Sequence, residues 1–168
     1  NIMPETFNDI VRPMNRGDLE QVLTWRNHSK IRHYMLSSKK ISMDEHAKWF
    51  DLASNNQKRK LCIFEADGIP LGFVQFNNAT SNNVSDWGFY AAFDAPKGMG
   101  KRLGDVALNY AFLTLGLHKV CGQALAFNKA SIYLHKKLGF TQEGVLREHS
   151  KIDNVYQDLI FFGLLSRE

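Results

Sequence analysis

The positions of hydrophobic and polar residues in the first third of the chain predict one strand and then two or three helices. Asn15 is followed three residues later by Asp18, and apolar residues then recur at helical spacing, which indicates an N-cap and a helix. The run Ser42-Met43-Asp44-Glu45 spells a capping box at the start of a further helix. The elements predicted here are a strand over 7–14 and helices near 16–27, 29–34 and 42–54.

From residue 60 onward the pattern changes to short apolar runs separated by turn residues, which predict strands. Two runs, 60–65 and 71–76, flank the turn pair Asp67-Gly68 and predict a hairpin. A third strand is expected over 84–92. Three consecutive strands favour an antiparallel meander.

The rest of the chain alternates helices and strands. After Pro96, apolar residues at helical spacing predict a long helix whose apolar face runs from Met99 to Leu113. The elements predicted after it are a strand over 120–127, a helix over 130–138 and a hairpin of strands 140–147 and 155–164. The order β, α, α, β, β, β, α, β, α, β, β predicts one α+β domain over 1–168, with a mixed, mostly antiparallel sheet flanked by helices.

Composition and charge narrow the class of protein. With 168 residues, 44% of them hydrophobic and 12 of them Phe, the chain can form a real core, which excludes a disordered protein. The 21 Lys and Arg residues against 17 Asp and Glu give a net charge of +4, spread along the chain. Nucleic acid is not required as a partner. A few lysines gathered at one site suit a small anionic ligand.

The cysteines and the longest apolar run indicate the compartment. Cys62 and Cys121 lie in apolar, strand-like runs, so we expect free thiols in a reducing cytosol. The apolar run 159–165 is far shorter than the ~18 residues that a membrane span needs. No His, Cys, Asp and Glu cluster has the spacing of metal ligands. We expect a cytoplasmic protein with no membrane partner and no metal.

A glycine-containing turn is predicted between the third strand of the meander and the long helix. Two glycines let the backbone approach a ligand, and the first N–H groups of the helix have no partner within it. The helix dipole and three nearby cations favour a pyrophosphate there. The residues concerned are Lys97, Gly98, Met99, Gly100, Lys101 and Arg102. The alternative is a surface turn with solvated lysines; the spelling is neither a P-loop nor a Rossmann fingerprint.

A second candidate motif spans residues 128–140. Asn128 can cap the predicted helix, and Gly139 stands where helices commonly end. Ser131 and His135 are four residues apart and share one face. The alternative for His135 is a surface or hydrogen-bonded histidine without a catalytic role.

These two motifs together resemble the GNAT superfamily of acetyl-CoA-dependent N-acetyltransferases, and the resemblance spans nearly the whole chain. Four further segments are similar to the pseudaminic-acid-pathway acetyltransferases. They are Trp25-Arg26-Asn27-His28, Trp87-Gly88-Phe89-Tyr90, Glu143-Gly144-Val145-Leu146-Arg147-Glu148-His149 and Tyr156-Gln157-Asp158. The resemblance implies a GNAT fold and acetyl transfer from acetyl-CoA to the 4-amino group of a UDP-linked 4-amino-4,6-dideoxy sugar.

The resemblance also implies positions for the cofactor. Tyr90 and Ala92 would run beside the pantetheine arm, and residues 97–102 would hold the pyrophosphate. Asn128, Ser131 and Lys137 would lie near the thiol end or the adenosine phosphate. Two positions depart from the pattern of the superfamily. Ala95 replaces its usual Arg or Gln, and His135 replaces its usual Tyr, with Tyr133 turned away on the helix.

Acetyl transfer to an amine needs a donor for the developing oxyanion and a proton for the departing thiolate. We expect backbone N–H groups of the segment 88–92 to polarise the thioester carbonyl. His135 is the candidate general acid, because an imidazolium of pKa ~6.5 protonates a thiolate of pKa ~8.5 downhill, whereas a Tyr of pKa ~10 does so uphill. An unperturbed histidine is only partly protonated at pH 7, and a neighbouring carboxylate or phosphate would raise its pKa and remove that cost. The alternative is that His135 only hydrogen-bonds the thiol and water supplies the proton.

The sequence indicates the acceptor site and the oligomeric state less directly than it indicates the cofactor site. The candidate residues for the UDP-sugar are Arg26, His28, His46, Trp49 and Trp87. The structural alternative for Trp25 and Trp49 is burial in the core. Two other functions remain open: an acetyltransferase for the N-termini of ribosomal proteins, which predicts an open acidic groove, and an acetyl-CoA-binding module without turnover. The long apolar final strand favours edge pairing into a homodimer.

Overall fold

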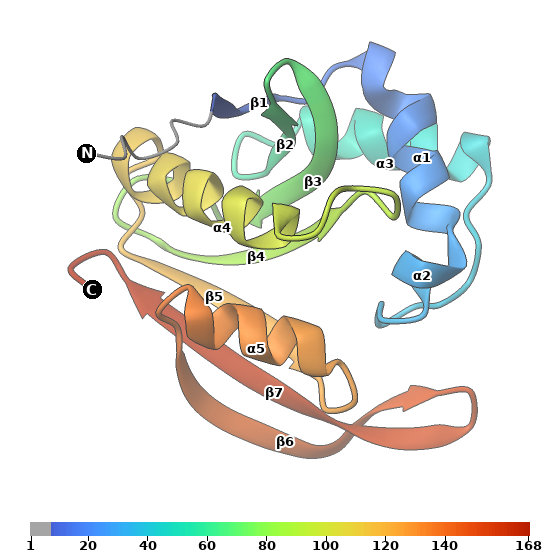
Figure 1. The fold of residues 1–168 in the computed structure, drawn as a ribbon, viewed down its shortest axis with the longest axis vertical. Helices are drawn as coiled ribbons and strands as arrows, with labels where there is room; N and C mark the ends of the chain where they lie inside the picture. Colours follow the sequence, from blue (N-terminus) through green and yellow to red (C-terminus); the bar gives the residue numbers. More distant parts are fainter. Residues whose placement is uncertain (1–7) are drawn as a thin grey trace, which may run out of the picture.

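Seven strands form one mixed sheet in the computed structural model, which describes residues 8–168 (Figure 1). The strands are β1 (Asp9–Pro13), β2 (Lys60–Ala66), β3 (Ile69–Asn77), β4 (Val84–Ala91), β5 (Lys119–Leu125), β6 (Thr141–Ile152) and β7 (Val155–Leu165). The helices are α1 (Leu19–Asn27), α2 (Ser29–Arg32), α3 (Met43–Ser54), α4 (Met99–Asn109) and α5 (Lys129–Lys137), with a 3-10 turn η1 (Arg16–Asp18) before α1 and a π-helical turn η2 (Tyr110–Thr114) after α4. The predicted α+β class is confirmed.

The sheet consists of two antiparallel parts joined by a short parallel contact. Strands β1 to β4 form the predicted meander, and β5, β7 and β6 form the second part. Between them, β4 pairs with β5 only where Val84–Asp86 lies beside Lys119–Cys121. Beyond these residues the two strands diverge, as Figure 1 shows.

Helices cover both faces of the first part of the sheet. Phe64 and Phe76 point to one face and pack with Leu103 of α4, whereas Ile63 and Phe73 point to the other and pack with helices α1 and α3. Strand β2 is therefore buried on both faces, which explains its nearly continuous apolar sequence. Helix α5 lies against the second part of the sheet (Figure 1).

Several bounds differ from the predictions. The last hairpin is longer than expected, because β6 continues to Ile152 through a register shift between Leu146 and Ser150. Helix α2 ends at Arg32, before the predicted Tyr34, and the first strand begins at Asp9. Residue 7, the predicted start of that strand, lies outside the described residues.

The final strand is not an edge of the sheet. Strand β7 pairs with β5 on one side and with β6 on the other, so both of its hydrogen-bonding edges are used within the chain. The predicted route to a homodimer through this strand is wrong, and the homodimer itself remains a prediction.

Both cysteines of the chain are free thiols, and the helices are short. Cys62 is buried and Cys121 half-buried, and both are free thiols as predicted. Burial raises the pKa of Cys62 to about 11. Within residues 8–168, no helix is long and apolar enough to cross a membrane.

Candidate functional site

A cleft of about 590 Å³ opens where β4 and β5 separate. Its walls come from residues 87–91 of β4 and 123–125 of β5, and the loop after α2 covers one end. The helices contribute Gly100, Asn128, Ser131, Leu134 and His135. The structure thus brings the two sequence motifs together around one cavity.

The backbone of β4 presents every second N–H group to this cleft. On its other side β4 pairs with β3, and the Ala92 N–H donates to a β3 carbonyl oxygen at 2.8 Å. Hydrogen-bonded residues alternate in an antiparallel ladder, so the N–H groups of Gly88 and Tyr90 also face β3. The N–H groups of Phe89 and Ala91 therefore face the cleft. The role of polarising the thioester carbonyl, predicted for the N–H groups of residues 88–92, is therefore wrong for Gly88, Tyr90 and Ala92.

The glycine turn forms the N-terminus of α4. Gly98 is the N-cap at φ +92°, a left-handed conformation that a side chain would strain, and no side chain caps the helix. Gly100 lines the cleft and lets α4 approach α5, because an added Cβ would lie 3.4 Å from Leu134 Cδ2. Met99 is buried in the core, so only its backbone is available to a ligand.

Two of the three predicted phosphate-binding cations already have carboxylate partners. Arg102 pairs with Asp9 of β1, with Nε 2.9 Å from Oδ2, and Lys101 Nζ lies 2.6 Å from Asp105 Oδ2. Lys97 is exposed at the turn. A pyrophosphate here would be held by helix N–H groups and Lys97 first, with the paired cations adding positive charge nearby.

His135 is buried inside the wall of the cleft, with 1% of its surface exposed. Its Nε2 lies 3.2 Å from the indole Nε1 of Trp87, and its Nδ1 lies 2.8 Å from the Ser131 carbonyl oxygen. An indole N–H only donates and a carbonyl oxygen only accepts. The imidazole is therefore neutral, with the proton on Nδ1 and the lone pair of Nε2 accepting from Trp87.

This environment opposes the predicted general-acid role of His135. A raised pKa would favour that role, but burial lowers the pKa of His135, and the hydrogen bond to the Ser131 carbonyl only partly offsets the effect. Both ring nitrogens are also engaged by protein groups. The imidazolium form that would protonate a thiolate is disfavoured at neutral pH, so the proton-donor role is not retained.

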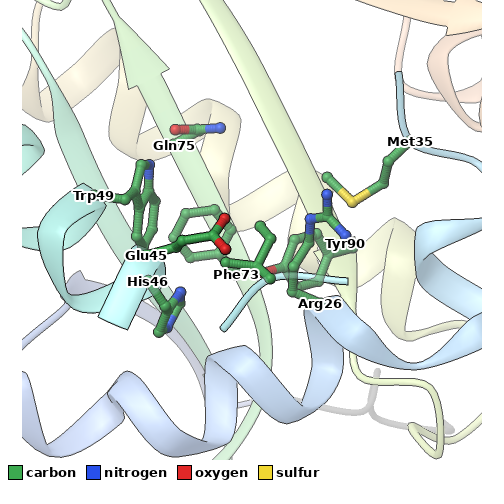
Figure 2. A pocket seen from close by; sticks show the side chains of 9 residues that line it. Arg26, Met35, Glu45, His46, Trp49, Phe73, Gln75 and Tyr90 are labelled. Carbon is green, nitrogen blue, oxygen red and sulfur yellow. The ribbon is translucent and has the colours of Figure 1, made fainter. Parts of the chain in front are cut away.

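A second cavity, of about 350 Å³, adjoins the cleft and contains three of the predicted acceptor-binding residues (Figure 2). These are Arg26, His46 and Trp49. The remaining lining residues are Met35, Ile41, Glu45, Phe73, Gln75 and Tyr90. Met35, Phe73, Gln75 and Tyr90 also line the cleft, so the two spaces meet at these side chains.

Arg26 lines this second cavity with a buried guanidinium group. The residue is 8% exposed, and its Nη2 donates to the Ser37 carbonyl oxygen at 2.8 Å. Its buried Nη1 has no hydrogen-bond partner among residues 8–168. Burial lowers the pKa of Arg26, while Tyr90 acts in the opposite direction. A buried guanidinium with an unpaired N–H group is costly unless a ligand satisfies it.

His46 is a second buried polar group of this cavity. Its Nε2 lies 2.9 Å from the Leu19 carbonyl oxygen, and its ring stacks on Trp49 at 5.2 Å. Burial lowers the pKa of His46, so the imidazole is neutral. Because the carbonyl accepts, Nε2 carries the proton and Nδ1 keeps a lone pair that can accept a hydrogen bond.

Four predicted residues lie outside their assigned places. His28 stacks on Phe93 at 3.9 Å and caps α2, away from both cavities. Trp87 lines the cleft between β4 and β5 and not the second cavity. Ala92 packs with the α1 and α3 core, and Lys137 is exposed beside the Tyr133 ring. Neither Ala92 nor Lys137 lines the cleft.

Most residues that line the second cavity were not among those predicted to bind the acceptor. Met35 and Ile41 lie in the connection after α2, and Phe73 and Gln75 come from a strand predicted only as part of the meander. Alternation along β3 could have indicated that 73 and 75 share a face. Nothing in the local sequence indicates which face meets the cavity.

Comparison with known proteins agrees with this architecture. Residues 10–141 match the family model described as "Acetyltransferase (GNAT) domain". Spermidine N(1)-acetyltransferase of Escherichia coli K12 is 26% identical over 162 residues, which cover 94% of this chain and 86% of that protein. Acetyltransferase PseH of Campylobacter jejuni is 27% identical over 129 residues, which cover 76% and 80%.

A solved structure shares the fold. The spermidine N-acetyltransferase from Vibrio cholerae, in complex with CoA and spermine, superposes with a TM-score of 0.87 at 24% identity, covering 95% of this chain and 96% of the other. Fold, cleft and sequence together define an acetyl-CoA-dependent N-acetyltransferase. The chain belongs to the GNAT acetyltransferase family.

These findings confirm the predicted family, fold, enzyme class and use of acetyl-CoA. The residues assigned to the cofactor and the acceptor remain predictions. Among residues 8–168, no group of three or more His, Cys, Asp or Glu side chains could hold a metal ion.

Proposed function

We propose that this enzyme acetylates the 4-amino group of a UDP-linked 4-amino-4,6-dideoxy sugar that binds in the Arg26 cavity. The observation that carries the proposal is Arg26, which lines the cavity with a buried guanidinium whose Nη1 has no hydrogen-bond partner among residues 8–168. A phosphate or uracil carbonyl oxygen would satisfy this group. The resemblance of the segments 25–28 and 87–90 to the pseudaminic-acid-pathway acetyltransferases supports the same class of acceptor.

The cavity is poorly suited to a polyamine. Glu45 is the only carboxylate among its lining residues and is exposed, whereas Arg26 places a buried positive charge inside. A cationic acceptor would meet like charge in a site of low dielectric constant, which is costly. An acidic groove for a ribosomal-protein N-terminus is disfavoured for the same reason. From the similarity to spermidine acetyltransferases we therefore infer the fold and the cofactor of this enzyme, and not its acceptor.

Acetyl-CoA is placed in the cleft between β4 and β5. The pantetheine arm would follow the unpaired edge of β4, beside Asn128 and Ser131, with the pyrophosphate at Lys97 and the N-terminus of α4. The N–H groups of Phe89 and Ala91 would donate to the thioester carbonyl oxygen as it becomes negative. In this proposal, the acetyl group and the amine meet at the side chains that the two cavities share.

The reaction is a direct transfer. The neutral amine attacks the thioester carbonyl carbon, a C–N bond forms, and the C–S bond breaks. The nitrogen loses one proton and the departing thiolate gains one. Because the His135 nitrogens are both engaged, we assign these proton exchanges to water in the cleft. His46, with a lone pair on Nδ1, is assigned to binding the acceptor.

A thiol-release assay with acetyl-CoA tests the acceptor assignment. The panel contains UDP-4-amino-4,6-dideoxy sugars, spermidine and peptides with free N-termini. We expect release with the UDP-amino sugars, and an Arg26→Met variant should lose about 100-fold in kcat/KM for them. Arg16→Met, at an exposed arginine paired with Asp51, is the matched control and should keep wild-type activity. Faster release with spermidine or peptides than with every sugar would contradict the proposal.

A further inference from the structure

Two side chains from different elements meet where β4 and β5 begin to diverge. Trp87 directly follows Asp86, the last residue of β4 that pairs with β5, and Gly122 directly follows its partner Cys121. Trp87 belongs to β4 and His135 to α5, which covers the second part of the sheet (Figure 1). Their hydrogen bond is 3.2 Å long and buried. It lies at the first residues of β4 and β5 that no longer pair with each other.

Gly122 leaves the space that this contact occupies. A Cβ added there would overlap His135 Nε2 and would lie 2.8 Å from Trp87 Nε1. The imidazole and indole thus pass directly over the β5 backbone at the position where continued pairing with β4 would otherwise be expected. A side chain at residue 122 and the Trp87–His135 contact exclude each other.

The surroundings fix this contact from every side. The His135 ring stacks on Phe162 of β7, with centroids 4.9 Å apart and planes at 9°, and meets the edge of Phe140 at 5.0 Å. Trp87 stacks on Phe140 at 5.3 Å. The Nδ1–H group of His135 donates to the Ser131 carbonyl oxygen, with 2.8 Å between nitrogen and oxygen. Aromatic packing of this kind holds one rotamer of each ring, so the hydrogen bond has a fixed place relative to both strands.

We propose that the Trp87–His135 hydrogen bond above Gly122 is a positioning device that sets the separation of β4 and β5, and so the width of the cleft beside them. His135 then acts through Trp87 as a hydrogen-bond acceptor and donates no proton to the thiolate. This assignment rests on the proposed placement of acetyl-CoA between the two strands. It also gives a role to the histidine that departs from the pattern of the superfamily.

The proposed role restricts which side chains can replace His135. The side chain must accept a hydrogen bond from the indole N–H in an apolar enclosure, which an amide oxygen can also do. The amide oxygen of glutamine reaches about as far as Nε2, so His135→Gln should retain function in large part, whereas His135→Leu leaves the indole N–H without an acceptor. Trp87→Phe removes the donor while keeping an aromatic ring. Trp25→Phe changes another buried tryptophan that lies outside both cavities and is the matched control.

Steady-state kinetics and calorimetric titration of coenzyme A separate the roles. We expect His135→Leu and Trp87→Phe to weaken coenzyme A binding and to raise KM for acetyl-CoA about tenfold, with a smaller change in kcat. His135→Gln should recover most of the affinity, and Trp25→Phe should match the wild type. A fall in kcat at unchanged coenzyme A affinity, or no rescue by glutamine, would overturn the positioning role.

A measurement on the wild-type protein covers the case in which a variant fails to fold. Long-range ¹H–¹⁵N correlation spectra of the histidine rings should show one neutral ring protonated on Nδ1 at pH 6.5, in contact with a tryptophan indole N–H. A protonated or Nε2–H ring at residue 135 would overturn the inference. If wild-type protein does not bind coenzyme A, the proposed cofactor site fails as well; if wild type and all variants bind it equally, only the positioning role fails.

Discussion

Burial determines the chemistry of the two histidines at the site. His46 and His135 are both almost fully enclosed, and each has a ring nitrogen bonded to a backbone carbonyl. A carbonyl partner favours a protonated nitrogen, but the loss of hydration disfavours the charged ring and dominates in both cases. Each histidine is therefore a neutral hydrogen-bonding group at physiological pH.

This protonation behaviour gives a prediction for stability. Burial lowers the pKa of both histidines from the ordinary 6.5, so below pH 6.5 the unfolded chain binds more protons than the folded protein. The free energy of unfolding should fall as pH drops below 6.5, by up to about 1.4 kcal/mol per pH unit for each histidine. Urea unfolding between pH 7.5 and 5 measures this dependence.

The variants for that experiment differ in burial. His46→Gln should flatten the pH dependence by the share of one histidine. His149→Gln, at an exposed position, serves as the control variant. A wild-type stability that stays constant from pH 7 to pH 5 would disprove the assigned neutral state.

At the scale of single residues, the sequence located the site better than it assigned roles. Arg26, His46 and Trp49 were predicted for the acceptor and do line one cavity. The role of His135 was misjudged because its environment comes from Trp87, which is 48 residues away in sequence. A pKa depends on such tertiary neighbours, and motif spacing does not encode them.

Among the elements, β4 and α4 do most to shape the site. One edge of β4 is used by β3 and the other is left open beyond Asp86, so alternate N–H groups reach the cleft. Helix α4 packs on the same strands, which fixes its N-terminus at the end of that cleft. The position of α4 therefore depends on close packing against β3.

Gly72 of β3 is where this packing is tightest. A Cβ there would lie 3.0 Å from the Tyr90 carbonyl oxygen and would overlap Leu103, which is fully buried. Gly72→Ala should destabilise the protein by about 1–3 kcal/mol, because neither neighbour has space to move. Thermal and urea unfolding measure the change.

Gly144 in β6 offers the matched control. Nothing lies within 4 Å of a Cβ added at this position, so Gly144→Ala should be close to neutral. Equal stability of the two variants would show that α4 is not held against β3 in the manner described.

The sequence predicted strands well where their own alternation was strong and less well where pairing comes from a partner. The meander and α4 follow from local patterns. Residues 148–152 of β6 lack an apolar alternation and are strand only because β7 pairs with Ser150, Lys151 and Ile152. The divergence of β4 from β5 beyond Asp86 could not be predicted either, because the local alternation of a strand does not encode where its pairing with a distant strand ends.

On the scale of the whole molecule, the two cavities meet at shared side chains, as a route from cofactor to acceptor requires. The cleft and the Arg26 cavity share the side chains around Tyr90, so a thioester in one can face an amine in the other. A net charge of +4 is modest but suits two anionic substrates that approach the same region. The account requires acetyl-CoA to enter along β4.

A crystal structure of the protein with coenzyme A tests that requirement most directly. The account predicts the pantetheine arm between β4 and β5, hydrogen-bonded to the N–H groups of Phe89 and Ala91, with the pyrophosphate at Lys97 and the N-terminus of α4. Coenzyme A bound elsewhere, with the separation between β4 and β5 closed by side chains, would contradict it.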